Sequence, residues 1–172
     1  RDVTEQQRQQ RQIRTDRDKL DTILGNIPGG VAVFFSCGGI IKMDYTNNGF
    51  YELHHGSRAY WDSVSSNPLD WLSEADRQAF CEEFDRVERG EKTQGSSTYC
   101  VTGEDGFPHW VNNQFRRAYM RAGVQYYYAT FVDMDDRITA QMREDESYRK
   151  AMRQLVQAAD NTLGSFSVNL TT

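Results

Sequence analysis

Hydrophobic residues recur at seven-residue intervals in the first part of the chain. Ile13, Leu20 and Ile27 are seven residues apart, and Ile23 and Leu24 widen the same stripe. This spacing keeps side chains on one face of an α-helix. The pattern therefore predicts a long helix over residues 1–26, acting as a linker after a preceding domain. A proline and two glycines follow directly and predict its end.

The next hundred residues alternate between short β-prone runs and helical patterns. Apolar positions at i, i+4 and i+7 spacing within residues 74–89, preceded by Ser73, predict a capped helix. Asn47 is a typical N-cap residue and predicts a shorter helix after it. Runs of β-branched and aromatic residues predict strands in residues 31–35, 40–45, 97–102, 110–119 and 124–132. Together these elements predict one α+β domain over residues 27–136.

A helical pattern returns after this domain. Hydrophobic residues follow a heptad frame over residues 137–161, with Asp145 and Arg149 at two positions of the apolar seam. We predict a second linker helix that forms an imperfect coiled coil. Residues 162–172 then repeat the turn-and-strand pattern of the domain's first strand, so we expect a following domain to start there.

Composition and charge narrow the class of protein. The 172 residues are enough for one domain with extensions, and 26% of them are charged. A net charge of −5 argues against a general nucleic-acid binder, which would normally carry a concentrated basic face. No apolar run approaches the roughly 18 residues that cross a bilayer. We therefore expect a cytoplasmic protein in which this segment contacts neither nucleic acid nor membrane.

Three local segments, taken in order, resemble segments of PAS domains. Asn47-Asn48-Gly49-Phe50 is similar to the Asn-Pro-Ala-Phe segment at that family's first short helix. Leu72-Ser73-Glu74-Ala75-Asp76-Arg77 is similar to its His-Pro-Asp-Asp-Arg segment, without the histidine and the proline. Asp105-Gly106 followed by Trp110 resembles the Asp-Gly and tryptophan of the subgroup called PAS fold 3. The resemblance covers residues 22–137.

The end of the domain carries a fourth similarity. Asp133, and more completely Asp2-Val3-Thr4, resembles the Asp-Ile-Thr motif with which PAS domains end. A chain that opens on this motif and repeats a degraded copy of it resembles one unit of a tandem PAS array in a bacterial signalling protein. The resemblance implies a five-stranded antiparallel sheet with short helices on one face, a small cavity, and long signalling helices on both sides. The last residues also faintly resemble the phosphoacceptor segment of histidine kinases, with Thr172 at the histidine position.

Cofactor motifs of the family are missing from this sequence. Light-responsive flavin-binding members carry a reactive cysteine in an Asn-Cys-Arg-Phe-Leu-Gln motif, which does not occur here. A haem would need an axial histidine, for which His54, His55 and His109 are the candidates, but we expect hydrogen-bonded or exposed histidines. The histidines and cysteines lack zinc-site spacing, so no metal site is predicted. The cofactor is therefore unknown, and a small organic ligand is the open alternative.

We expect the interior of the domain to hold any small-molecule site. If Asn112 and Gln114 share an inward face with Trp110, they place amide groups in an apolar cavity, which is typical of ligand sites. The expected lining residues are Tyr99, Trp110, Asn112, Gln114, Tyr126 and Tyr128. The alternative is that the two amides face solvent and aromatic side chains fill the cavity.

Signal transmission would depend on the linkers. By resemblance, Asp133 ties the angle of the exit helix to the sheet; the alternative is an ordinary helix cap. Polar Asp145 and Arg149 would weaken any single coiled-coil register and so favour a switch between two arrangements.

These features lead to one functional hypothesis with two alternatives. We predict a sensory and dimerisation PAS module that forms a homodimer through its flanking helices and relays a ligand- or partner-induced change. Its neighbours would be PAS or output domains, such as a histidine kinase or a cyclic-dinucleotide enzyme. The alternatives are a structural PAS spacer with a filled core, or a small α+β enzyme. No hydrolase, phosphate-loop or kinase motif occurs, so we predict no catalytic activity for this segment.

Overall fold

The computed structural model describes the backbone of residues 2–170 and the side chains of residues 3–162. The chain forms two units, one that ends at Met134 and one that begins at Asp135. The first contains a long helix and a mixed α+β domain, and the second is a single helix. The linker helix predicted for residues 1–26 is α1 (Asp2–Gly25).

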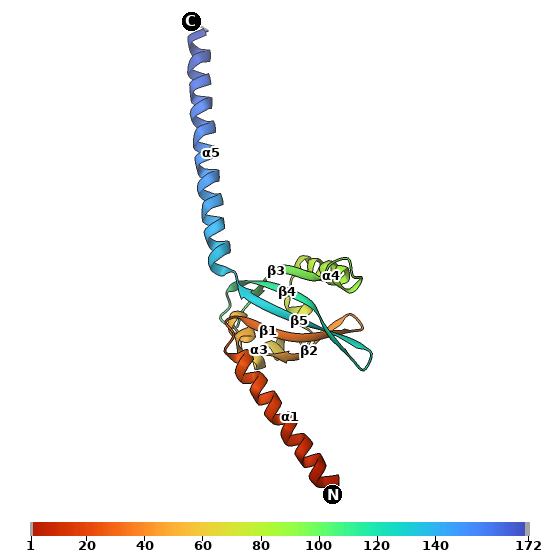
Figure 1. Cartoon of the computed structure of the whole chain (residues 1–172). Helices are drawn as coiled ribbons and strands as arrows, with labels where there is room; N and C mark the ends of the chain where they lie inside the picture. The colour runs from red at the N-terminus through yellow and green to blue at the C-terminus, as the bar shows by residue number, and fades with distance from the viewer. Residues whose placement is uncertain (1, 171–172) are drawn as a thin grey trace. The chain divides into compact units, whose positions relative to one another are not determined.

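The domain is built on one five-stranded antiparallel sheet with strand order β2-β1-β5-β4-β3 (Figure 1). The first and last strands of the chain therefore lie side by side in the middle of the sheet. This confirms the predicted α+β fold and all predicted strands. The strands are β1 (Gly30–Cys37), β2 (Ile40–Thr46), β3 (Gln94–Thr102), β4 (Pro108–Arg121) and β5 (Val124–Asp133).

Short helices connect β2 to β3. They are α2 (Asn48–Leu53), α3 (Arg58–Val64), the 3-10 helix η1 (Pro68–Trp71) and α4 (Glu74–Glu88). Ser73 caps α4 as predicted, because its hydroxyl accepts the amide of Asp76 at 3.2 Å. The Asp76 carboxylate accepts the amide of Cys100 at 3.2 Å instead of completing a capping box. This contact holds α4 against β3.

The hydrophobic core lies between these helices and one face of the sheet. Aromatic rings dominate it. Phe34 stacks on Tyr127 with ring centroids 5.4 Å apart, and the ring centroids of Phe80 and Phe115 are 5.3 Å apart. Gly95 faces the ring of Phe115 so closely that an added Cβ would collide with it. The close packing of this aromatic layer therefore requires a glycine on β3.

The opposite, outer face of the sheet carries a second aromatic group. Tyr119 stacks on Tyr126 with ring centroids 5.0 Å apart, and the ring centroids of Phe35 and Tyr126 are 5.1 Å apart. These side chains are only partly buried or exposed. Both faces of the sheet are thus rich in aromatic residues. It is therefore hard to assign from the sequence which alternate side chains of each strand face the core.

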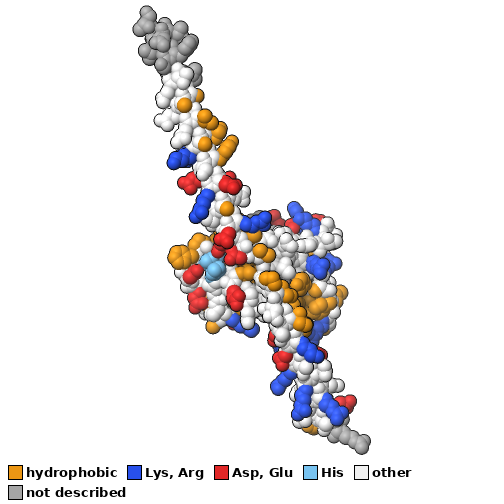
Figure 2. All heavy atoms as spheres, turned by 60° about the vertical axis from the view of Figure 1, so that its left-hand side comes forward, with side chains coloured by type: hydrophobic (Ala, Val, Ile, Leu, Met, Phe, Trp, Pro, Cys, Tyr) orange, Lys and Arg blue, Asp and Glu red, His pale blue; other side chains and the backbone are white. Residues whose placement is uncertain are grey.

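The second unit is α5, one continuous helix from Asp135 to Leu170. It contains the helix predicted over residues 137–161. The turn and strand predicted from residue 162 are wrong up to residue 170, because the backbone there stays helical; residues 171–172 lie outside the described part. Figure 2 shows hydrophobic side chains along one side of α5. The exposed large hydrophobic residues in the described part of α5 are Met142, Tyr148, Met152, Leu155 and Val156.

Within the described residues, no helix combines the length and the apolar character that crossing a membrane requires.

Candidate functional site

Asn47 joins three elements at one edge of the domain. Its Oδ1 accepts the amides of Val31 at 2.8 Å and Phe50 at 3.0 Å, so it binds β1 and caps α2. Its Nδ2 donates to the carbonyl of Leu24, in the last turn of α1, at 2.9 Å and to that of Gly29 at 3.3 Å. Only the capping role was predicted from sequence. With 4% of its surface exposed, Asn47 makes the end of α1 part of the domain's hydrogen-bond network.

His54 lies at the C-terminal end of α2 and is fully buried in the aromatic core. Its Nδ1 is 2.6 Å from the carbonyl oxygen of Phe50, which can only accept, so Nδ1 carries the proton and donates. Its Nε2 then accepts from the hydroxyl of Tyr99 on β3, at 2.7 Å. Burial lowers the pKa of His54 to about 4 and raises the pKa of Tyr99. Both ring nitrogens of His54 are therefore engaged, and the ring is neutral at pH 7.

A small cavity of about 40 Å³ lies in the core between the sheet and the helices. Apolar and aromatic side chains form most of its wall, and Tyr99 on β3 and Asn113 on β4 also line it. The Oδ1 atom of Asn113 is buried and has no hydrogen-bond partner. A volume of this size holds a few water molecules at most, whereas sites for drug-sized ligands measure roughly 300 Å³ or more. Aromatic rings thus occupy most of the space that the resemblance assigns to a ligand.

The structure corrects most of the predicted pocket lining. Tyr99 does line the cavity. The other five lie on the outer face of the sheet, away from the cavity: Trp110, Asn112, Gln114, Tyr126 and Tyr128.

The prediction exchanged the inward-facing and outward-facing side chains of β4 and β5, which is an error of one residue along each strand. Alternate strand residues point to opposite faces, so a one-residue shift exchanges the two sets. On β4 the inward set is Val111, Asn113 and Phe115, all buried. In the sequence, the apolar Val111 and Phe115 indicate that this set faces inward. The prediction instead took Trp110, in the alternate set, as inward-facing.

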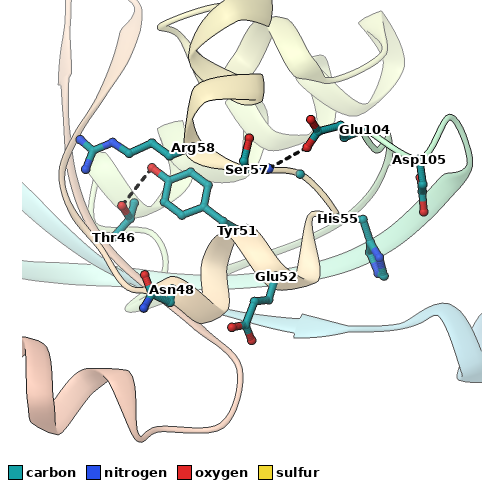
Figure 3. A pocket seen from close by; sticks show the side chains of 10 residues that line it. Thr46, Asn48, Tyr51, Glu52, His55, Ser57, Arg58, Glu104 and Asp105 are labelled. Atoms are coloured by element: carbon teal, nitrogen blue, oxygen red, sulfur yellow. Dashed lines mark hydrogen bonds between the residues drawn. The ribbon is translucent and has the colours of Figure 1, made fainter.

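An open groove of about 780 Å³ lies beside α2, with the turn between β3 and β4 on its other side (Figure 3). The hydroxyl of Thr46 donates to that of Tyr51 at 3.1 Å inside it, and the Ser57 amide donates to the Glu104 carboxylate at 3.1 Å. The second contact connects the start of α3 to the turn. The groove's wall is polar and charged, unlike the interior cavity.

His55 and Asp105 line this groove, and both lie close to His109. The rings of His55 and His109 stack with centroids 3.5 Å apart and planes 10° apart. His109 Nε2 is 2.7 Å from Asp105 Oδ2. The Phe107 amide, and to a smaller extent His109, lower the pKa of Asp105. One potential ligand atom from each of these three residues lies within 4.8 Å of those of the other two.

The predicted signalling residues occupy different surroundings. Asp133, the last residue of β5, has its carboxylate 4.0 Å from His55 Nε2. Asp145 and Arg149 are exposed on α5. The role of all three in signalling stays a prediction.

Sequence comparison gives no match, neither to a protein-family model nor to a curated protein. Solved structures do match. A sensory box histidine kinase/response regulator from Burkholderia thailandensis E264 is 13% identical, with a TM-score of 0.55 over 73% of this chain and 91% of that chain.

Two further structures extend the comparison. The PAS domain of an HTR-like protein from Haloarcula marismortui is 16% identical, with a TM-score of 0.50 over 74% of this chain and 98% of that chain. A LOV protein from Rhodobacter sphaeroides is 9% identical, with a TM-score of 0.53 over 70% of this chain and 68% of that chain. At such identities the likeness concerns the fold. The arrangement of five strands and connecting helices described above is the fold of PAS domains.

Proposed function

We propose that this chain is a sensory PAS module that detects a small molecule in its interior and passes the change to its flanking helices. The observation that carries the proposal is the buried Oδ1 of Asn113, which lies without a partner in the wall of the core cavity. A buried acceptor without a hydrogen bond is costly, by about 1–3 kcal/mol. A molecule that donates a hydrogen bond there would remove this cost.

The size of the cavity restricts the molecule. About 40 Å³ admits water or a ligand of very few atoms unless core side chains move. Binding of anything larger would have to displace the rings around the cavity, among them Phe80 and Trp71. Such a displacement supplies the change in packing that a sensor needs, because close-packed cores respond in discrete rearrangements.

The connection to the helices supports the relay part of the proposal. The end of α1 is bound to the core of the domain through Asn47. On the other side, the Met134 amide donates to the carbonyl of Trp110 at 2.9 Å, directly before α5 begins in the sequence. Both linkers are thus continuous with hydrogen-bonded parts of the sheet.

The exposed hydrophobic side of α5 supports a homodimer through the flanking helices. Met152 and Val156 lie on the predicted seam and are 42% and 57% exposed. Isolated apolar side chains at heptad spacing gain stability when a second helix covers them. The output domain would be a histidine kinase or a cyclic-dinucleotide enzyme in a cytoplasmic signalling protein, and this segment itself would have no catalytic role.

The alternative function is a structural spacer, which the largely filled core favours. Native mass spectrometry and absorbance of the protein purified from its natural host distinguish the two. A bound small molecule that is lost in Asn113→Leu but kept in Asn112→Leu supports the sensor. Asn112 is the matched control, because it is an adjacent asparagine on the outer face of β4. Protein of unmodified mass, with no ligand released on unfolding, would support the spacer.

A further inference from the structure

We propose that His55, His109 and Asp105 form a binding site for a divalent transition-metal ion of the zinc type. Each residue offers one ligand atom, and these atoms all lie within 4.8 Å of one another. Ligands about 2.0–2.2 Å from a zinc ion lie up to about 4 Å apart. The donor atoms must therefore come closer together to share one ion.

The three residues come from separate elements that the fold holds together. His55 follows the end of α2, Asp105 lies in the turn between β3 and β4, and His109 is in β4. The Glu104 amide donates to the carbonyl of His55 at 2.8 Å, which fixes the turn to the end of α2. An added Cβ at Gly103 would approach both His55 and Asp105, so this close contact depends on a glycine.

The local backbone also orients the donors. His55 has a φ of 52°, a left-handed conformation that is uncommon for residues other than glycine. Asp105 Oδ1 accepts the Phe107 amide at 3.0 Å, which turns Oδ2 toward His109. His109 is 9% exposed, so its ring has little freedom to leave the site.

The types of donor suit a transition-metal ion. Two imidazole rings and a carboxylate lie together, with the ring centroids of His55 and His109 3.5 Å apart and His109 Nε2 2.7 Å from Asp105 Oδ2. Two imidazoles and one carboxylate are the donors that zinc prefers, whereas magnesium and calcium prefer sites made of oxygen alone.

Binding requires one local rearrangement. Nitrogens of parallel stacked rings do not point at one position, so the more exposed ring, His55, must rotate about its Cβ–Cγ bond. The proton between His109 Nε2 and Asp105 must also leave, as is usual when histidine binds a metal. Asp133, 4.0 Å from His55, would then be a second carboxylate near the ion. The ion would hold the β3–β4 turn to α2 at one end of the groove in Figure 3, where His55 and Asp105 are both labelled.

The site is tested on the tag-free chain with Zn²⁺ and with Co²⁺. We expect one Zn²⁺ per chain in a competition titration with a chromogenic chelator, and visible absorption bands from bound Co²⁺. His55→Ala and Asp105→Asn should each weaken Zn²⁺ binding by at least about tenfold, since even residues that only orient ligands contribute that much. Asp105 is exposed, so its variant should fold even if a change at His109 prevents folding.

Glu104→Gln is the matched control, because Glu104 is the adjacent carboxylate and its side chain contacts Ser57. It should leave Zn²⁺ affinity unchanged. Zn²⁺ affinity that is equal in all variants would place the ion elsewhere and overturn the proposal. Failure to bind Zn²⁺ at micromolar concentrations would do the same. Neither result bears on the interior ligand, which is measured separately by native mass spectrometry.

Discussion

The side chains of His54 and Tyr99 share a 2.7 Å hydrogen bond inside the core, although they are 45 residues apart in sequence. This bond joins the C-terminal end of α2 to β3. The second ring nitrogen of His54 is bonded to the backbone of its own helix. The pair is therefore a fully satisfied polar contact in apolar surroundings, and such contacts are costly to disrupt.

Tyr99→Phe should reduce the free energy of unfolding by about 1–3 kcal/mol. The change removes the donor and leaves His54 Nε2 buried without a partner. Tyr128→Phe, on the outer face of the sheet, is the control and should have a smaller effect. Urea denaturation followed by tryptophan fluorescence measures both. Equal effects of the two substitutions would contradict the importance of the buried bond.

Stability should fall as the pH is lowered from about 6.5 toward 4. The pKa of His54 is about 4 in the folded protein, compared with 6.5 in the unfolded chain. Between these values only the unfolded chain takes up the proton, so protonation favours unfolding. The difference corresponds to about 3 kcal/mol, at about 1.4 kcal/mol per pH unit.

The variant His54→Gln isolates this contribution. Glutamine can keep hydrogen bonds at this position but does not titrate. The free energy of unfolding, measured by denaturation across this pH range, should therefore change less with pH in the variant than in the parent protein. Parallel pH dependence in the two proteins would show that other groups, such as carboxylates, account for the acid sensitivity.

Asn113→Leu should raise the free energy of unfolding of the ligand-free protein by about 1 kcal/mol. Leucine removes the buried acceptor without a partner and adds apolar atoms beside the 40 Å³ cavity. Asn112→Leu should instead be neutral or destabilising, because Asn112 donates to the Thr98 hydroxyl at 2.9 Å. Thermal unfolding by calorimetry measures the two changes. Strong destabilisation by Asn113→Leu would mean that its Oδ1 is satisfied in solution.

Asn47→Ala should destabilise the domain by about 3 kcal/mol and loosen the end of α1. The substitution removes four hydrogen bonds, including the cap of α2 and the bond to Leu24. Asn48→Ala changes the adjacent, exposed asparagine and should have little effect. Hydrogen exchange of the last turn of α1 provides the local measurement. Unchanged protection there in Asn47→Ala would contradict the proposed link between α1 and the sheet.

Replacing Asp145 and Arg149 together by leucine should strengthen dimerisation of the chain. Both lie on the heptad seam of α5, where apolar side chains favour helix pairing. Sedimentation equilibrium should show a dimer at lower protein concentration than for the parent. The control places two leucines off the seam, at Ser147 and Gln154. A similar gain in both double variants would indicate general hydrophobic association.

Local sequence patterns predicted most of the backbone. The heptad spacing in α1 and α5, the capping residues Ser73 and Asn47, and the β-prone runs all depend on neighbours within a few residues. Such short-range preferences can be read without knowing the tertiary structure. The helical continuation of α5 to Leu170 was missed because a glycine and β-branched residues there resemble a turn and strand.

The sequence by itself determined the order of elements, their approximate bounds and the amphipathic seams of the helices. Only the tertiary structure decided that Asn113 lines the cavity in place of Asn112, and that His55, Asp105 and His109 lie close together. The reason is physical. With aromatic residues on both faces of the sheet, hydrophobicity alone does not define the phase of a strand. Contacts between distant residues, in turn, depend on how the sheet and the helices pack against each other.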